Sequence, residues 1–266
     1  MPLPPSPPDA LAVSAASSFA PPTGAQAQLW WTSTTVPATV LAELRGTLDP
    51  ATAGRVDGMV READRRRTIL AHGLLRRLVC TFTGLAPADV QLARHCESCD
   101  ANDHGKPYLV AVDGQPAPVA FNLAHSADVV AVVVAAPGAR VGVDVESVVE
   151  GFDWEPVRRH VFTDAEWGAS GAAADPSAER FALWARKEAS AKATGDGLSI
   201  DLRHVSISPF EGPGGARTSR LTAPGATTDL LVVDAALPTA EPVSAAVAVV
   251  GQAEPPALRV TQALLD

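Results

Sequence analysis

The stretch that most constrains this chain is residues 141–146, with the sequence V-G-V-D-V-E. Valines alternate there with small or acidic residues, a pattern that predicts a β-strand. Residues two apart on a strand point to the same face, so Asp144 and Glu146 present two carboxylates side by side. Such a pair is commonly only a polar face toward water, so it does not define a site by itself.

A second stretch, residues 184–192, reads W-A-R-K-E-A-S-A-K and predicts a helix. Trp184, Glu188 and Lys192 follow one another at intervals of four and therefore lie close together on its surface. Glu188 and Lys192 alone could be an ordinary surface pair that contributes about 0.2–0.5 kcal/mol. Three carboxylates and a lysine that converge would suit a hard divalent cation bound to a phosphate, above all Mg²⁺.

Composition limits the class of protein. The 266 residues can form one large domain or two modest ones, and 47% apolar residues suffice for a core. No run of about 18 uninterrupted apolar residues predicts a membrane span, and the N-terminus does not resemble a signal peptide, so a cytoplasmic protein without a membrane partner is expected. Three cysteines argue against a disulfide framework, and the net charge of −9 argues against general binding of nucleic acid.

The first part of the chain predicts a tail, a strand and a long helix. Residues 1–28 are rich in Pro, Ala and Ser and predict a disordered tail, and residues 29–32 predict a first strand. A helix is predicted over residues 57–82 and ends before Gly84. Its buried stripe is expected at Leu70, Leu74, Leu78 and Phe82.

The middle and the end of the chain predict a mixture of strands and helices. Residues 119–123 predict a strand, and the apolar run 129–136 predicts another, buried on both faces and paired as a β-hairpin with residues 141–146. The remaining expected elements are a short helical region over 153–169, a loop over 168–176, a helix over 179–194 that ends at Gly195, extended chain over 198–209, a loop over 211–219, strands over 229–234 and 243–250, and a peripheral tail from Ala253.

Two further groups of side chains invite a functional interpretation. Arginines crowd the first long helix and either form a solvated face or contact phosphate groups; they are Arg55, Arg61, Arg65, Arg66, Arg67, Arg76 and Arg77. Cys96 and Cys99 form half of a zinc knuckle, which His95 and His104, or Cys80, could complete. Because no second Cys-x-x-Cys occurs, free thiols in a loop are the favoured interpretation.

Together these motifs resemble the signature of the Sfp-type 4′-phosphopantetheinyl transferases, which move the phosphopantetheine arm of coenzyme A onto a serine of a carrier protein. The similar elements are V-G-V-D-V-E, then F-x-x-x-E-W, which is chiefly structural, and W-x-x-K-E-A-x-x-K-x-x-G-x-G-L. The similarity covers roughly residues 29–250. The matching residues are Gly142, Asp144, Glu146, Phe162, Glu166, Trp184, Lys187, Glu188, Lys192, Gly195, Gly197 and Leu198.

The resemblance implies an α+β fold made of two similar α/β halves, related by a pseudo-two-fold axis, with the site in the cleft between them. Residues 29–140 would form the N-terminal half with the nucleotide contacts. Residues 141–252 would form the C-terminal half with the Mg²⁺ site and the catalytic helix. Residues 1–28 and 253–266 would be tails, and the protein is expected to be a monomer.

The resemblance also implies roles for individual residues. Asp144, Glu146 and Glu188 would bind Mg²⁺, Glu188 would be the base for the serine proton, and Lys192 would act beside Asp144 on the leaving group. The elements G-K-P at 105–107 and N-L-A-H-S at 122–126 resemble coenzyme A contacts, although Ala124 replaces a serine that is usual in the family. The expected contacts to coenzyme A are Arg55, Arg67, Thr68, Lys106, Pro107, His125, Ser126, Asp144, Lys187 and Lys192.

The implied reaction is displacement at the β-phosphate of coenzyme A by the serine hydroxyl of an apo acyl- or peptidyl-carrier protein, with 3′,5′-ADP as leaving group. Polyketide, nonribosomal peptide or fatty acid biosynthesis are the implied settings. The main alternative is a catalytically inactive module that binds coenzyme A or a carrier protein; the presence of every charged motif position favours the enzyme. A Mg²⁺-nucleotide hydrolase is disfavoured because the chain contains no G-x-x-x-x-G-K-[ST] loop.

Overall fold

The computed structural model describes residues 20–87, 89–96, 100–110, 117–195, 200–223 and 226–265, and the side chains of Cys96, Asp103, His104 and Ala223 are not part of that description. The elements up to residue 135 are β1 (Gln26–Ser33), α1 (Ala38–Gly46), α2 (Pro50–Gly58), α3 (Glu62–Thr83), β2 (Leu92–Cys96), β3 (Ala101–Leu109), β4 (Ala120–Ser126) and β5 (Val129–Ala135). The following elements are β6 (Val141–Ser147), α4 (Glu155–Val161), α5 (Asp164–Gly171), α6 (Pro176–Thr194), η2 (Leu202–His204), β7 (Val205–Ile207), η3 (Pro213–Gly215), β8 (Arg217–Ala223), β9 (Ala226–Asp234), β10 (Val243–Val250) and β11 (Ala257–Gln262).

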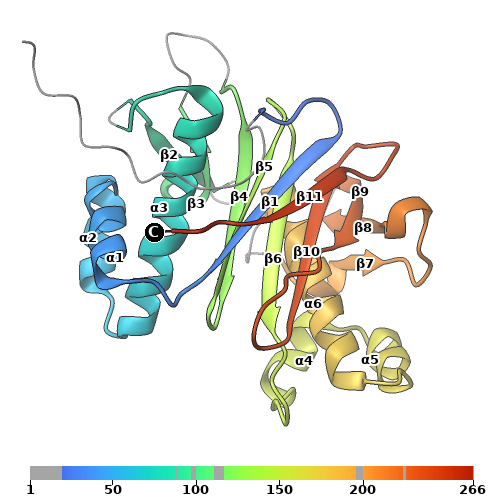
Figure 1. Cartoon of the computed structure of the whole chain (residues 1–266). Helices are drawn as coiled ribbons and strands as arrows, with labels where there is room; N and C mark the ends of the chain where they lie inside the picture. Colours follow the sequence, from blue (N-terminus) through green and yellow to red (C-terminus); the bar gives the residue numbers. More distant parts are fainter. Residues whose placement is uncertain are drawn as a thin grey trace, which may run out of the picture.

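Two β-sheets pack against each other between two long helices (Figure 1). A four-stranded sheet has the order β11-β1-β5-β4, and a five-stranded sheet has the order β6-β10-β9-β8-β7. Helix α3 packs on β5 and β4, and α6 packs on β6, β10 and β9. The layers therefore follow one another as α3, first sheet, second sheet and α6. Strands β2 and β3 form a separate hairpin.

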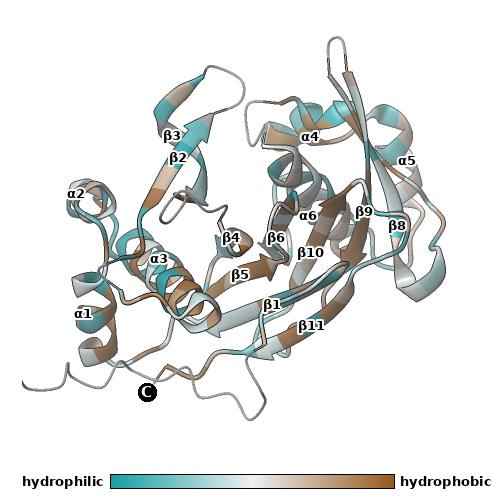
Figure 2. Cartoon of the chain, turned by 90° about the horizontal axis from the view of Figure 1, so that it is seen from above, coloured by the Kyte–Doolittle hydropathy of each residue, from teal (hydrophilic) through white to brown (hydrophobic). Residues whose placement is uncertain are grey.

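The strand β5 shows why the sequence builds these layers. Val130, Val132 and Val134 contribute to the core under α3, whereas Ala131 and Val133 contribute to the core between the two sheets. Successive side chains on a strand point to opposite faces, so a continuous apolar run is what a strand between two cores needs. Figure 2 shows the apolar character of β5 and β10 at the centre of the fold. The predicted burial of this strand on both faces is confirmed.

The predicted hairpin between this strand and the acidic strand is wrong. Strand β5 pairs with β1 and β4, whereas β6 pairs with β10. The turn that contains Gly138, whose φ of 74° is in the left-handed region, carries the chain from one sheet into the other. The two strands consequently face each other across the middle core instead of lying side by side.

The predicted long helix over 57–82 is two helices. Met59 and Arg61 have extended backbones, so α2 ends at Gly58 and α3 begins at Glu62. Acidic residues in the first turn of α3 favour this start, since they interact with the positive end of the helix dipole. Gly84 ends the helix in a left-handed conformation, as predicted, and the predicted stripe is buried.

The expected tails contain structural elements. Strand β1 begins at Gln26, inside the predicted tail, while residues 1–19 lie outside the described chain. The segment predicted to be peripheral forms β11, which pairs in parallel with β1, and Ala263 and Leu265 are buried in the core under α3. Alternation in A-L-R-V-T-Q is too short a signal to reveal a strand whose partner lies more than 200 residues away.

The other boundaries differ by a few residues. Helix α5 extends to Gly171 and α6 begins at Pro176, which leaves a loop shorter than predicted. Strand β8 begins at Arg217, inside a predicted loop. The extended chain predicted over 198–209 contains the short 3-10 helix η2, and residues 198 and 199 lie outside the described chain.

Among the described helices, none combines the length and the apolar character that crossing a bilayer requires.

Gly142 allows β6 and α6 to approach each other closely. A Cβ atom at this position would overlap the carbonyl oxygen of Ala189 and the backbone nitrogen of Ala193. Both are main-chain atoms of α6, so no side chain can rotate away to make room. The contact fixes the separation between the strand that bears Asp144 and the helix that bears Glu188.

Replacement of Gly142 by alanine should therefore destabilise the fold. We expect Gly142→Ala to lower the free energy of unfolding by about 1–3 kcal/mol or more, the usual cost of overpacking, as measured by urea denaturation. The matched control is Gly168→Ala in α5, where an added Cβ meets no described atom within 4 Å. That control should be neutral or slightly stabilising. Equal stability of the two variants would contradict the close-contact explanation.

Candidate active site

The acidic strand and the second long helix meet, as the sequence predicted. The Nζ atom of Lys192 on α6 lies 2.5 Å from Oδ1 of Asp144 on β6 and 3.9 Å from Oε2 of Glu188. Asp144 and Glu188 are 4% and 7% exposed, so these charges interact in a medium that screens them weakly. The Glu188–Lys192 pair is thus part of a buried group rather than an isolated surface pair.

Asp144, Glu146 and Glu188, if all were ionised, would carry more negative charge than one lysine balances. Burial raises the pKa of Asp144 to about 6, with Glu188 adding to the effect and Lys192 opposing it. Burial, reinforced by Asp144 and Glu188, raises the pKa of Glu146 to about 8. Burial disfavours the charge on Lys192 as well, but the neighbouring carboxylates outweigh burial and raise its pKa. The group as a whole favours an additional cation.

The donor chemistry of this group fits magnesium. Oδ2 of Asp144 is buried and has no hydrogen-bond partner among the described residues, which is unusual for a carboxylate oxygen. Carboxylate oxygens are the ligands that Mg²⁺ prefers. In the described part of the chain, no three His, Cys, Asp or Glu side chains are gathered as tightly as in a formed metal site. Lys192 occupies the other oxygen of Asp144 in this arrangement.

Strand β4 adds polar groups beside the carboxylates. The hydroxyl of Ser126 donates to Oε2 of Glu146 at 3.5 Å and accepts a hydrogen bond from the backbone N–H of Ser147 at 3.2 Å. Oδ1 of Asn122 accepts from the backbone N–H of Val143, which ties β4 to β6. The predicted N-L-A-H-S element thus borders the acidic group.

His125 and Ala124 lie on opposite faces of the same strand. His125 is exposed as a residue, yet partial burial of its ring, together with the cations Arg67 and Lys192, lowers its pKa. Its ring is therefore near both the start of α3 and the acidic group. Ala124 is buried in the core between the sheets, where a methyl group packs without needing a hydrogen-bond partner.

Lys106 links the β2–β3 hairpin to the end of α6. Its Nζ atom donates to the carbonyl oxygens of Val141 and Ala193, at 3.0 and 3.5 Å. Ala193 lies in the last turn of α6, where free carbonyl groups favour a cation. The neighbouring Pro107 points to the other face of β3 and lines a cavity.

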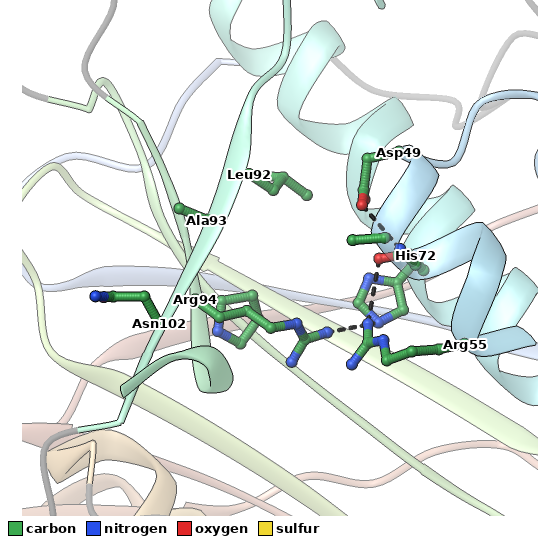
Figure 3. Close-up of a pocket in the computed structure, with 10 residues that line it drawn as sticks. Asp49, Arg55, His72, Leu92, Ala93, Arg94 and Asn102 are labelled. Carbon is green, nitrogen blue, oxygen red and sulfur yellow. Dashed lines mark hydrogen bonds between the residues drawn. The ribbon is translucent and has the colours of Figure 1, made fainter. Parts of the chain in front are cut away.

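That cavity, of about 290 Å³, lies between α2, α3 and the β2–β3 hairpin (Figure 3). Arg55 and Arg94 both line it, and Nη2 of Arg94 lies 3.2 Å from Nε2 of His72. Burial, Arg94 and Arg55 lower the pKa of His72 to about 3, so the imidazole is neutral and accepts from Arg94. Burial and Arg55 lower the pKa of Arg94 to about 10, which leaves it charged at neutral pH. The lining also contains Asp49, which caps α2 by accepting from the backbone N–H of Thr52. Two guanidinium groups outnumber this one carboxylate, so the cavity keeps a net positive charge that suits an anion.

Arg94 and His72 were not among the predicted site residues. Two signals could have indicated them. Arg94 pairs with Pro107 of the G-K-P element across the hairpin, and His72 is a polar residue between Leu70 and Leu74 of the apolar stripe. The position of His72 is visible in the sequence, whereas the pairing of Arg94 depends on the hairpin register, which brings Arg94 to His72.

Two predicted contacts, Arg67 and Thr68, are not among the residues that line this cavity. Arg67 forms an ion pair with Asp64 and donates to the carbonyl oxygen of Ala127 at 3.1 Å. Thr68 is buried, and its hydroxyl lies 3.5 Å from the sulfur of Met59. Arg67 acts on His125 through its charge, whereas Thr68 contributes mainly to the packing between α2 and α3.

The predicted phosphate contact of Lys187 is wrong in this structure. Lys187 is fully buried, and its Nζ atom donates to the carbonyl oxygens of Val161 and Leu202 and to Oε2 of Glu166 at 2.7 Å. Burial lowers the pKa of Lys187, and Glu166 opposes that effect. Glu166 also forms a capping box with Thr163 at the start of α5. The F-x-x-x-E-W element is therefore structural, as predicted, and Lys187 belongs to it.

Parts of two other predictions lie outside the described residues. Gly195 ends α6 with a φ of 95°, as predicted, but Gly197 and Leu198 are not described. The zinc hypothesis concerns the side chains of Cys96, Cys99 and His104, which are not described either. The interpretation as zinc site or free thiols stays a prediction.

Comparison with known proteins places the chain in a family. Residues 140–247 match the model of the 4′-phosphopantetheinyl transferase superfamily, and residues 32–137 match the model of the 4′-phosphopantetheinyl transferase N-terminal region. The chain belongs to the 4′-phosphopantetheinyl transferase family.

Individual relatives carry related names. The chain is 39% identical over 170 residues to an L-aminoadipate-semialdehyde dehydrogenase-phosphopantetheinyl transferase of Eremothecium gossypii, covering 60% of this chain and 57% of the relative. It is 32% identical over 184 residues to a phosphopantetheinyl transferase of a Thraustochytrium species, covering 60% and 59%. A 4′-phosphopantetheinyl transferase of a Nostoc species, HetI, is 27% identical over 192 residues, covering 70% and 76%. The match thus spans somewhat more than half the length of the first two relatives.

The burial of Lys187 predicts a role in stability. Lys187→Met should lower the free energy of unfolding by about 3–5 kcal/mol, because Glu166 loses its partner in a poorly solvated position. Chemical denaturation measures the effect. The double variant Lys187→Met, Glu166→Gln should be less destabilised than the single one. A stable Lys187→Met protein with weakened coenzyme A affinity would restore the phosphate-contact interpretation.

Proposed function

We propose that this protein transfers the 4′-phosphopantetheine arm of coenzyme A to a serine of an apo acyl- or peptidyl-carrier protein and releases 3′,5′-ADP. The observation that carries the proposal is the buried group in which Lys192 lies between Asp144 and Glu188, on the elements that resemble the family signature. Family membership and the names of the relatives support it. Fatty acid, polyketide or nonribosomal peptide biosynthesis would be the setting, and we propose a cytoplasmic monomer.

Coenzyme A carries two groups of phosphates that the site can bind separately. The cavity with Arg55, Arg94 and Pro107 would take the nucleotide end with its 3′-phosphate. The pyrophosphate would lie near Lys192, between His125 and the carboxylates, with Lys106 and Ser126 at its margin. The charge of Lys192 acts on His125, and that of His125 acts on His72, which supports a ligand that extends from the acidic group to the cavity.

Asp144, Glu146 and Glu188 would hold Mg²⁺, which supplies charge neutralisation and Lewis acidity at the pyrophosphate. The unpartnered oxygen of Asp144 and the raised pKa values of Asp144 and Glu146 support a cation at this place.

The chemical step is a displacement at phosphorus. Glu188 accepts the proton of the carrier serine, whose oxygen forms a bond to the β-phosphorus while the bond from that phosphorus to the bridging oxygen breaks. The electron pair remains on that oxygen, which becomes part of 3′,5′-ADP. Lys192 stabilises the developing negative charge or protonates it. The protein needs no nucleophile of its own because the nucleophile belongs to the carrier protein.

The division into two halves, 29–140 and 141–252, is part of the proposal. Each half provides one long helix that packs on a sheet, α3 or α6, which supports a pseudo-two-fold relation. Strand β11 joins the first sheet, so the segment 253–266 completes the N-terminal half instead of forming a separate tail.

Intact-mass analysis of an apo carrier protein tests the function. Incubation with this protein, coenzyme A and Mg²⁺ should add the mass of one phosphopantetheine arm to the carrier protein. Binding of coenzyme A or carrier protein without a gain in mass would instead favour the inactive binding module.

Glu188 is the residue on which the reaction depends most directly. Glu188→Gln keeps the size and one oxygen but removes the basic carboxylate, so transfer should fall by about two orders of magnitude or more. The variant should still fold and bind coenzyme A, and a higher Mg²⁺ concentration should restore only part of the rate. Turnover close to that of the wild type in a folded sample would return Glu188 to an ordinary ion pair.

The cationic cavity predicts discrimination between ligands. Arg55→Gln should raise the Kd of coenzyme A about ten- to a hundredfold, the range expected for a lost hydrogen bond to a charged group. It should affect 3′-dephospho-coenzyme A much less, as titration calorimetry can show. Arg45→Gln is the matched control, since Arg45 pairs with Asp57 on the exposed side of the same region. An equal loss for both ligands would place the 3′-phosphate elsewhere.

A further inference from the structure

We propose that Trp184 is a positioning residue for Glu188, an inference that rests on the proposed function. The indole Nε1 atom of Trp184 donates a hydrogen bond to Oε1 of Glu188 at 3.3 Å. The two residues are one turn apart on α6, so the bond forms along one face of the helix. Trp184 thereby contacts the proposed base directly.

The indole ring is held in place by other aromatic rings. It stacks on Phe181, with ring centroids 6.4 Å apart and planes 9° from parallel. Phe152 and Trp154 lie against it at centroid distances of 6.2 and 6.1 Å. A ring packed on several sides keeps its N–H group pointing in one direction. The aromatic cluster consists of Phe152, Trp154, Phe162, Trp167, Phe181 and Trp184.

The hydrogen bond divides the two oxygens of Glu188 between two roles. Oε1 is occupied by Trp184, while Oε2 lies 3.9 Å from Lys192 and faces the acidic group. A neutral donor fixes the orientation of the carboxylate and leaves its negative charge in place, whereas a second lysine would neutralise that charge. The carboxylate of Glu188 is therefore oriented before the substrates bind, with one oxygen directed toward the site.

A purely structural role for Trp184 makes different predictions. If the ring served only to fill space in the aromatic cluster, a phenyl group would retain most of its contacts, and the loss of the N–H group would not affect turnover. The test must therefore remove the N–H group and keep an aromatic ring.

Trp184→Phe meets this requirement, and Trp167→Phe is the matched control in the same cluster. We expect Trp184→Phe to lower kcat about tenfold with little change in KM for coenzyme A, and Trp167→Phe to stay within about twofold of the wild type. Similar kcat values for the two variants, at similar folded fractions, would overturn the proposal.

A double variant separates positioning from packing. If Trp184 acts through Glu188, the loss caused by Trp184→Phe should shrink to below about threefold in the Glu188→Gln background, because the base that it orients is absent. The same loss in both backgrounds would show that Trp184 acts independently of Glu188, which would overturn the proposal.

A spectroscopic measurement does not depend on activity. The indole ¹⁵N–¹H resonance of Trp184, identified by its disappearance in Trp184→Phe, should shift in Glu188→Gln, whereas the resonance of Trp167 should not. An unshifted resonance would exclude the hydrogen bond.

Failure of this inference can be distinguished from failure of the proposed function. Wild-type protein that adds no phosphopantetheine arm to the carrier protein would contradict the proposed function. An active wild-type protein together with a fully active Trp184→Phe variant would contradict only this inference.

Discussion

The direct contact between the backbones of β6 and α6 is the constraint on which the rest of the site depends. Gly142 has no Cβ atom, and for this reason the strand lies against the turn of α6 that contains Ala189 and Ala193. Asp144 follows two residues later on the strand, and Glu188 and Lys192 flank the contact on the helix. One side chain more at this position would separate the acid from the lysine. The geometry of the charges is thus set by main-chain packing, which is stiffer than any arrangement of surface side chains.

The charges themselves are arranged as two opposite regions. The carboxylates between β6 and α6 carry an excess of negative charge in a poorly solvated place, while the cavity under the β2–β3 hairpin carries two guanidinium groups and a neutral histidine. A phosphate group could meet the guanidinium groups of the cavity directly, whereas beside the carboxylates it would need Lys192 and a bound cation.

The sequence predicts the acidic strand, the second long helix, their convergence and the strand buried on both faces, because each of these depends on a local period in apolar or charged residues. It does not predict the arginine cavity, since Arg94 reaches His72 only through the register of a hairpin. It predicts a phosphate contact for Lys187, because the sequence pattern around a helical lysine is the same whether the lysine faces a phosphate or a buried glutamate. It also places β5 and β6 in one hairpin, because a Pro-Gly turn alone does not show whether the chain stays in one sheet. Long-range pairing is what these cases share.

The parallel pairing of β11 with β1 has a consequence for how the molecule is made. During synthesis, β1, β5 and β4 emerge first, yet the edge of β1 has no neighbour until the ribosome has produced residues 257–262. Until then, one edge of the sheet exposes unpaired backbone groups to any other extended chain nearby. In the five-stranded sheet, β7 to β10 pair with neighbours in sequence, but β6 also waits for β10, which is translated shortly before β11. The part of the protein translated first is therefore the part completed last, and the nascent chain depends during that interval on whatever shields an open edge in the cell.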